Sequence, residues 1–243
     1  MLSLWWMLSP NFGDALGPVL ARELAKDPLV AFTPKTEPHH ILCGSVLNHA
    51  NEHSTVWGAG LASATDEVDA RARVLATRGP LSRARALEFG VAPFEAYGDP
   101  GLLVGTIWST PSAWTAWSSG TLLVPHYIDY RTVVRWDRPV VDVLGPVHDT
   151  DGRIAGADRV ASSSLHGLVA AAAHGVPFAW VSFGGTIGGD GFKYRDFFAS
   201  LGMEVEEQRV EYPDDVDRLR YYEAPRQVVQ DRIDAIMEVC PWR

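Results

Sequence analysis

Residues 159–181, RVASSSLHGLVAAAAHGVPFAWV, contain the clearest structural pattern in this sequence. The pattern predicts a strand over 159–162, a helix over 165–174 and a second strand over 178–181. A glycine and a proline follow the predicted helix, and both residue types commonly stand where a helix ends. A strand, a helix and a strand in this order are typical of a parallel sheet in an α/β fold.

Short apolar runs alternate with helical patterns along the rest of the chain, which extends the same interpretation to all of it. Further strands are predicted at 2–8, 41–43, 55–57, 74–76, 122–124 and 140–143, and further helices at 16–24, 80–87, 194–201 and 227–239. The stretch 108–120 is rich in Trp, Ser and Thr and has weak periodicity, so we interpret it as the crossing between two halves. We therefore expect an N-terminal half over 1–118, a C-terminal half over 119–225 and a closing helix over 226–243.

The composition narrows the classes of function. The chain has 243 residues, 47% of them hydrophobic, which is enough for one large domain or two small ones. Its formal net charge is −9 and it has no run rich in Lys or Arg, which argues against a nucleic-acid-binding protein. An anionic ligand must then be held by a few placed cations and backbone amides. Cys43 and Cys240 lie far apart without CxxC spacing, which disfavours a zinc site or a disulfide framework and indicates a reducing cytoplasm.

The N-terminal residues 1–8 are apolar and could be mistaken for a signal peptide. They lack a preceding basic region, and the polar sequence that follows ends the apolar run too early, so a short buried strand fits better. No apolar segment reaches the roughly 18–20 residues that a membrane span needs. We therefore expect a cytoplasmic protein without a membrane span.

A first group of candidate site residues follows the first predicted strand. Asn11, Gly13 and Asp14 lie between this strand and the helix after it, at the end of a parallel strand where ligands gather. The glycine permits a tight turn, and the amides at the start of the helix can receive an anion. The alternative is that Asp14 only caps the helix.

The second group lies within the stretch quoted first. The hydroxyls of Ser162, Ser163 and Ser164, together with free amides at the helix start, can hold a phosphate or carboxylate. His166 in the first helical turn could hold a proton near neutral pH and deliver it. The alternative is a serine-capped helix with an incidental histidine.

Three further cationic or titratable residues are candidates. Arg78 follows a predicted strand and could bind a carboxylate or phosphate through two N–H groups, although a surface arginine is the commoner case. His126 ends the strand that opens the second half and could face the same site. Lys193 follows the glycine-rich segment 184–191 and could close over an anion, unless it belongs to a solvated helix face.

Eight motifs in this order resemble the polysaccharide pyruvyl transferase family. They are Asn11-Phe12-Gly13-Asp14-Ala15-Leu16, Gly44-Ser45-Val46-Leu47, Trp57-Gly58-Ala59-Gly60, Arg78-Gly79-Pro80-Leu81-Ser82, Gly98-Asp99-Pro100-Gly101-Leu102-Leu103, Pro125-His126-Tyr127, Ser163-Ser164-Leu165-His166-Gly167 and Lys193-Tyr194-Arg195-Asp196-Phe197. The resemblance covers about residues 4–200 and is closest to the exopolysaccharide-type branch. It implies two Rossmann-like halves, like the glycosyltransferase B architecture, with the active site in the cleft between them. It also implies that Arg78 and His166 handle phosphoenolpyruvate.

The resemblance implies a transferase that moves a pyruvyl group from phosphoenolpyruvate to two hydroxyls of a sugar in a polysaccharide or a lipid-linked precursor. We expect His166 to act as the acid, Arg78 and Ser162–Ser164 to hold the anion, and Asp14 to orient or deprotonate the acceptor. Phosphoenolpyruvate is the donor substrate, and neither a cofactor nor a metal is expected. One alternative is a nucleotide-sugar-dependent glycosyltransferase. The other is a non-catalytic glycan-binding relative, and the presence of both Arg78 and His166 argues against this second alternative.

Overall fold

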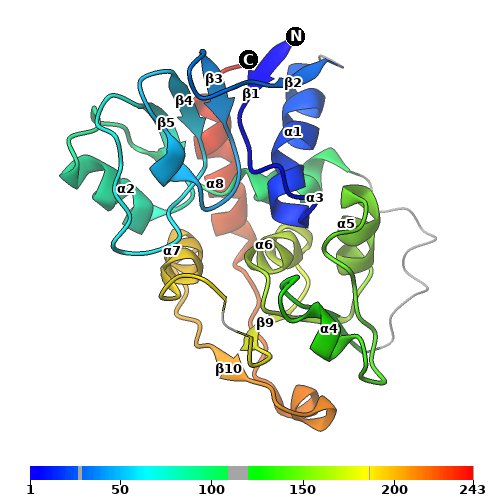
Figure 1. Ribbon diagram of the computed structural model, residues 1–243. Helices are drawn as coiled ribbons and strands as arrows, with labels where there is room; N and C mark the ends of the chain where they lie inside the picture. Colours follow the sequence, from blue (N-terminus) through cyan, green and yellow to red (C-terminus); the bar gives the residue numbers. More distant parts are fainter. Residues whose placement is uncertain (27–28, 109–119, 186, 243) are drawn as a thin grey trace.

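The computed structural model describes residues 1–26, 29–108, 120–185 and 187–242, and it contains two parallel β-sheets with helices packed around them (Figure 1). The predicted α/β class with parallel sheets is confirmed. The predicted boundary between residues 118 and 119 lies outside the described residues, so the division into halves stays a prediction. None of the described helices is both long enough and apolar enough to cross a membrane.

The first sheet has the strand order β2-β1-β3-β4-β5-β6 and the second has the order β10-β9-β8-β7. The strands are β1 (Leu2–Leu4), β2 (Val30–Phe32), β3 (His39–Ile41), β4 (Ser54–Trp57), β5 (Arg73–Thr77), β6 (Ala96–Tyr97), β7 (Thr121–Val124), β8 (Arg159–Ser162), β9 (Phe178–Ser182) and β10 (Gln208–Arg209). The α-helices are α1 (Phe12–Ala25), α2 (Pro80–Glu88), α3 (Val104–Ile107), α4 (Tyr130–Val133), α5 (Val147–Ala155), α6 (Leu165–His174), α7 (Phe192–Ser200) and α8 (Arg226–Glu238). The 3-10 helices are η1 (Leu47–His49), η2 (Pro100–Leu103) and η4 (Pro213–Arg218).

The strand order of the first sheet reverses between β1 and β3. From β1 the chain passes through α1 to β2 on one side of β1, and β3 then pairs with the opposite side. In open parallel sheets, ligands bind outside the carboxyl ends of the strands at such a reversal. The topology therefore marks the loops that follow β1 and β3 as the place where a ligand is expected.

Helix α6 lies at the centre of the fold (Figure 1). Its residues from Leu165 to Ala172 are all buried, and it packs against α3, α5, η2 and β8. The run of four alanines gives the helix a thin profile, so neighbouring elements approach it closely. Gly175 ends the helix in a left-handed conformation with φ 68°, as the sequence predicts. Packing on so many sides fixes the position of the amino-terminal end of α6.

Helix α8 returns from the second sheet to the first one. The Trp57 indole N–H on β4 donates a 2.7 Å hydrogen bond to the Ile236 carbonyl, and α8 also packs against β6. Figure 1 shows α8, in red, beside the strands of the first sheet. The sequence predicts this helix but not its contact with the first sheet.

The predicted strand over 140–143 is wrong. Val140 pairs with Leu123 of β7 at a single position, and the chain then turns through Asp142, whose side chain accepts the Leu144 N–H. The apolar side chains of Val141 and Val143 are buried, as the run suggests, but they pack from a turn. A short apolar run is typical of a strand, but a turn that buries its apolar side chains gives the same sequence pattern.

Candidate active site

A cavity of about 230 Å³ lies where the loops after several strands come together. Its walls come from the loops after β1, β3, β7 and β8, from the starts of α1, α6 and α7, and from η1. The lining residues are Met7, Asn11, Asp14, Gly44, Ser45, Val46, His49, His126, Tyr127, Ser164, Leu165, His166 and Lys193. The cavity therefore occupies the point of strand-order reversal in the first sheet and receives residues that follow two strands of the second sheet.

Asp14 lies in the first turn of α1, and Asn11 precedes that helix. The Asn11 side-chain amide donates a 3.2 Å hydrogen bond to Asp14 Oδ2. Burial raises the pKa of Asp14, while the Asn11 hydrogen bond and the charges of His166 and Lys193 oppose this rise. The N-cap residue Asn11 makes no side-chain capping hydrogen bond, and Asp14 lines the cavity.

The sequence predicts that Gly13 permits a tight turn. In the structure the reason for glycine at this position is close packing instead. Gly13 lies inside α1, where its backbone is helical, and the His166 ring packs directly against it. A Cβ atom at residue 13 would overlap the imidazole, with Nδ1 the nearest atom. Any side chain here would displace His166.

His166 faces a carboxylate that sequence reasoning did not select. Its Nε2 lies 3.8 Å from Oδ2 of Asp99, and both atoms are buried without a hydrogen-bond partner. The other Asp99 oxygen accepts the Gly101 N–H at 2.8 Å, which fixes the carboxylate in place. Burial lowers the pKa of His166, and the negative charges of Asp99 and Asp14 act against that lowering. Without a bound anion, the imidazole is therefore biased towards its neutral form.

The three serines before α6 have different positions. The Ser162 hydroxyl is fully buried and donates to the Val124 carbonyl at 2.8 Å. The Ser163 hydroxyl is also buried; it donates to Asp129 at 2.6 Å and accepts the His126 N–H at 2.9 Å. Ser164 alone of the three lines the cavity. It is the N-cap residue of α6, and its side chain makes no capping hydrogen bond.

Lys193 and His126 are the remaining predicted residues in the cavity. Burial, and to a smaller extent the nearby charge of Arg78, lower the pKa of Lys193 to about 8, while Asp14 opposes this lowering. Burial lowers the pKa of His126 to about 4, with a smaller contribution from Lys193. Near neutral pH the cavity therefore holds one buried ammonium group and a neutral His126 imidazole.

Arg78 does not line the cavity. Its guanidinium is fully buried and contacts Asp196 of α7 through Nε at 3.1 Å and Nη2 at 3.0 Å. Nη2 also donates to the Leu61 carbonyl at 2.6 Å, and Nη1 donates to the Ser45 hydroxyl at 2.9 Å. Ser45 does line the cavity, so Arg78 reaches the site through this serine. The prediction that Arg78 itself binds the donor anion stays a prediction.

Several residues of the site were missed by sequence reasoning. Ser45, His49 and Tyr127 line the cavity, and Asp99 and Asp196 lie directly behind it. All but His49 belong to motifs that carried the family resemblance, so the motifs pointed to the right segments without giving each residue a role. Within the described residues, no group of three His, Cys, Asp or Glu side chains is placed to hold a metal ion.

Comparison with known proteins gives one family and two relatives. The family described as polysaccharide pyruvyl transferase matches residues 11–184. An uncharacterized protein, L143, of Acanthamoeba polyphaga mimivirus is 27% identical over 214 residues, which are 82% of this chain and 74% of that protein. The succinoglycan biosynthesis protein ExoV of Rhizobium meliloti (strain 1021) is 27% identical over 222 residues, which are 85% of this chain and 66% of that protein. No solved structure matches this chain significantly.

Proposed function

Because this chain belongs to the polysaccharide pyruvyl transferase family, we propose that it transfers a pyruvyl group from phosphoenolpyruvate to two hydroxyls of one sugar, forming a cyclic ketal. The acceptor would be a sugar of a polysaccharide or of its lipid-linked precursor, and the reaction would take place in the cytoplasm. The observation that carries the proposal is the grouping of a helix start, an ammonium, an imidazole and a carboxylate in one small cavity.

The donor anion fits the end of the cavity formed by α6 and α7. The first amides of an α-helix have no partner within the helix, and the Ser164 side chain makes no capping hydrogen bond to those of α6. Lys193 adds a buried positive charge on the same cavity. At about 230 Å³ the cavity is smaller than the pockets of about 300–1,000 Å³ that hold drug-sized ligands. This size favours a small phosphate ester over a nucleotide sugar.

His166 would supply the proton that starts the reaction. The charge of the bound donor would raise the pKa of the imidazole, which therefore takes up a proton as the donor binds. Transfer of this proton to the methylene carbon converts it to a methyl group and leaves an oxocarbenium-like centre at the adjacent carbon. Asp99, whose carboxylate faces Nε2, would stabilise the charged imidazole before that transfer.

Asp14 would receive the acceptor. One sugar hydroxyl attacks the oxocarbenium centre and gives its proton to the Asp14 carboxylate, whose raised pKa suits this role. A second hydroxyl of the same sugar then displaces phosphate and closes the ketal. Of the two hydroxyl protons, one replaces the proton given by His166 and the other leaves with the phosphate.

Phosphoenolpyruvate alone should stabilise the folded protein. A ligand that binds only the native state adds about 2.7 kcal/mol to the free energy of unfolding at 100 times its dissociation constant. The melting temperature measured with and without phosphoenolpyruvate, with no metal added, checks this. A shift with uridine or guanosine diphosphate sugars and none with phosphoenolpyruvate would support a glycosyltransferase. Glycan binding without turnover of either donor would support a non-catalytic relative.

The affinity for phosphoenolpyruvate should fall as the pH rises above about 8. Lys193 is charged below its pKa of about 8, and a bound anion raises that pKa, so binding favours the ammonium form. Each pH unit above the free-protein pKa should then weaken binding about tenfold until the pKa of the complex is reached. Titration calorimetry between about pH 7 and 9 measures the slope. In Lys193→Met the slope should disappear, and an unchanged slope would assign it to another group.

A further inference from the structure

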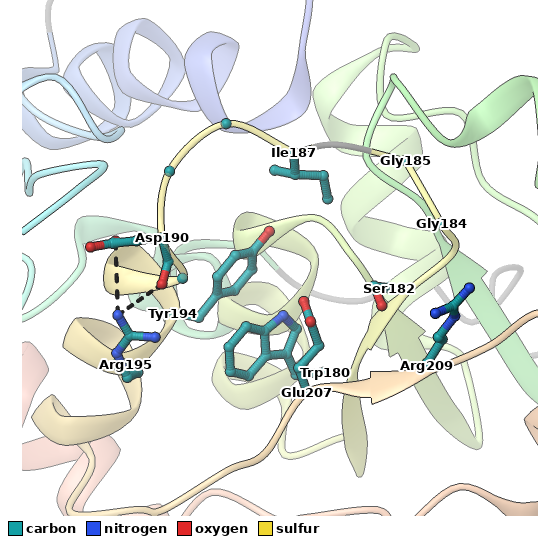
Figure 2. Close-up of a pocket in the computed structure, with 13 residues that line it drawn as sticks. Trp180, Ser182, Gly184, Gly185, Ile187, Asp190, Tyr194, Arg195, Glu207 and Arg209 are labelled. Carbon is teal, nitrogen blue, oxygen red and sulfur yellow. Dashed lines mark hydrogen bonds and ion pairs between the residues drawn. The ribbon is translucent and has the colours of Figure 1, made fainter.

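A second and larger hollow, of about 750 Å³, lies beneath the glycine-rich backbone that precedes α7. Figure 2 shows this backbone arching over the side chains of Trp180 and Tyr194, with Ile187 on the arch. Ser182 and Arg209 lie at the far side of the hollow, where β9 and β10 end. Neither the family motifs nor the proposed chemistry gives this hollow a role.

The charges around the hollow do not suit an anion. Arg195 donates to the Asp190 carbonyl at 2.9 Å and lies 3.8 Å from the Asp190 carboxylate. Arg209 forms a 2.7 Å ion pair with Glu211. Glu207 lines the hollow without an ion pair to any cation in the described part of the chain, and burial raises its pKa. A phosphate or nucleotide would meet paired cations and an unpaired carboxyl group.

The polar groups left over suit a neutral sugar. The Trp180 side chain is 6% exposed, and its Nε1 is buried without a hydrogen-bond partner. In Figure 2 the indole nitrogen lies on the edge of the ring that faces the arch. Sugar hydroxyls bind to N–H donors and carboxyl acceptors. The apolar face of a sugar ring packs against aromatic carbon. The volume of the hollow falls within the range of about 300–1,000 Å³ that is usual for ligand pockets.

The hollow and the smaller cavity are each lined by one of two consecutive residues of α7. Lys193 lines the cavity and Tyr194 lines the hollow. The Lys193 ammonium lies 5.2 Å from the centre of the Tyr194 ring, which in turn stacks on Trp180 at 4.6 Å and 19°. The Tyr194 hydroxyl donates to the Ser163 carbonyl at 2.7 Å, next to the start of α6. A glycan in the hollow would therefore be separated from the cavity proposed for the donor by the side chain of Tyr194.

We propose that this hollow binds neutral sugar residues of the acceptor glycan that adjoin the sugar receiving the pyruvyl group. The inference rests on the proposed function, because only an acceptor glycan needs a site next to the donor. Trp180 donates through Nε1 to a hydroxyl, Glu207 accepts from hydroxyls, and the glycine backbone leaves room for the chain of sugars. The reacting sugar itself lies nearer to Asp14 and His166.

The test measures binding of a panel of neutral oligosaccharides of glucose and galactose to the full chain by calorimetry. Trp180→Phe keeps an aromatic ring but removes the N–H, and should weaken the best binder about three- to tenfold. Glu207→Ala should weaken it about ten- to a hundredfold, since hydrogen bonds to charged groups are stronger. Trp242→Phe is the matched control, because Trp242 also has an unpartnered Nε1 but packs on His40 of the first sheet. It should leave binding unchanged.

The outcomes separate this inference from the proposed function. Normal phosphoenolpyruvate affinity in Trp180→Phe, together with weakened oligosaccharide binding, would support it. A wild type that binds oligosaccharides through Trp180 and Glu207 but fails to bind phosphoenolpyruvate would support the hollow as a glycan site. That result would contradict phosphoenolpyruvate as the donor. No binding by the wild type, or equal losses in Trp180→Phe and Trp242→Phe, would overturn the hollow as a glycan site. Uridine diphosphate binding that depends on Trp180 would assign it to a nucleotide.

Discussion

His166→Gln should lower the rate of pyruvyl transfer by about 100- to 10,000-fold, the usual cost of removing a general acid. Glutamine has a similar size and keeps a polar side chain beside Asp99, but it cannot deliver a proton to carbon. The affinity for phosphoenolpyruvate should change far less than the rate, because the amides of α6 and Lys193 remain. Steady-state rates and donor affinity, measured on the same preparation, separate these two effects.

His126→Gln provides the matched control for this variant. His126 lines the same cavity, but with a pKa of about 4 it is almost entirely unprotonated near neutral pH and has no proton to donate. Its loss should therefore reduce the rate much less than the loss of His166. The assignment fails if His166→Gln retains near-normal turnover, and His126 then becomes the first candidate for the acid. A His166→Gln protein that does not fold would instead give the histidine a structural role, which circular dichroism can show.

Asp196→Ala should lower the free energy of unfolding by about 3–5 kcal/mol, the usual cost of breaking a buried ion pair. One Asp196 oxygen accepts hydrogen bonds from Arg78 and from the Ser82 hydroxyl. The other accepts the backbone N–H groups of Leu81 and Ser82 in the first turn of α2, at 3.0 Å each. Removal of the carboxylate leaves the buried Arg78 guanidinium without its counter-charge and the amides of Leu81 and Ser82 without this acceptor.

Urea denaturation and thermal melting measure this loss, which corresponds to a fall of roughly 10 °C in melting temperature for a chain of this length. Asp217→Ala is the control, since Asp217 pairs with Arg138 through two hydrogen bonds at the surface, where ion pairs contribute about 0–1 kcal/mol. Equal losses in the two variants would contradict the role given to Asp196. The same experiment tests a structural role of Arg78, because its guanidinium pairs with Asp196 whether or not it also contributes to donor binding.

Much of the site could be located from the sequence. The hydroxyl-rich turn before residue 165, the histidine after it and Asp14 all lie at the ends of predicted parallel strands, and the structure brings Asp14, Ser164 and His166 into one cavity. Strand ends are predictable because apolar runs and glycines are local signals. The role of each side chain within those segments was not predictable, as Ser162 and Ser163 show by turning inwards.

The sequence by itself determined much of the succession of strands and helices and the family to which the chain belongs. Residues 159–181 form the predicted strand, helix and strand because apolar spacing, a glycine and a proline act over a few residues. Only the tertiary structure decided which buried charges are paired. Arg78 meets Asp196 across 118 residues of chain, and His166, after β8 of the second sheet, faces Asp99, after β6 of the first. Such partners are selected by how α2, α6 and α7 pack around the two sheets, because a buried charge must find its counter-charge wherever the packing places it.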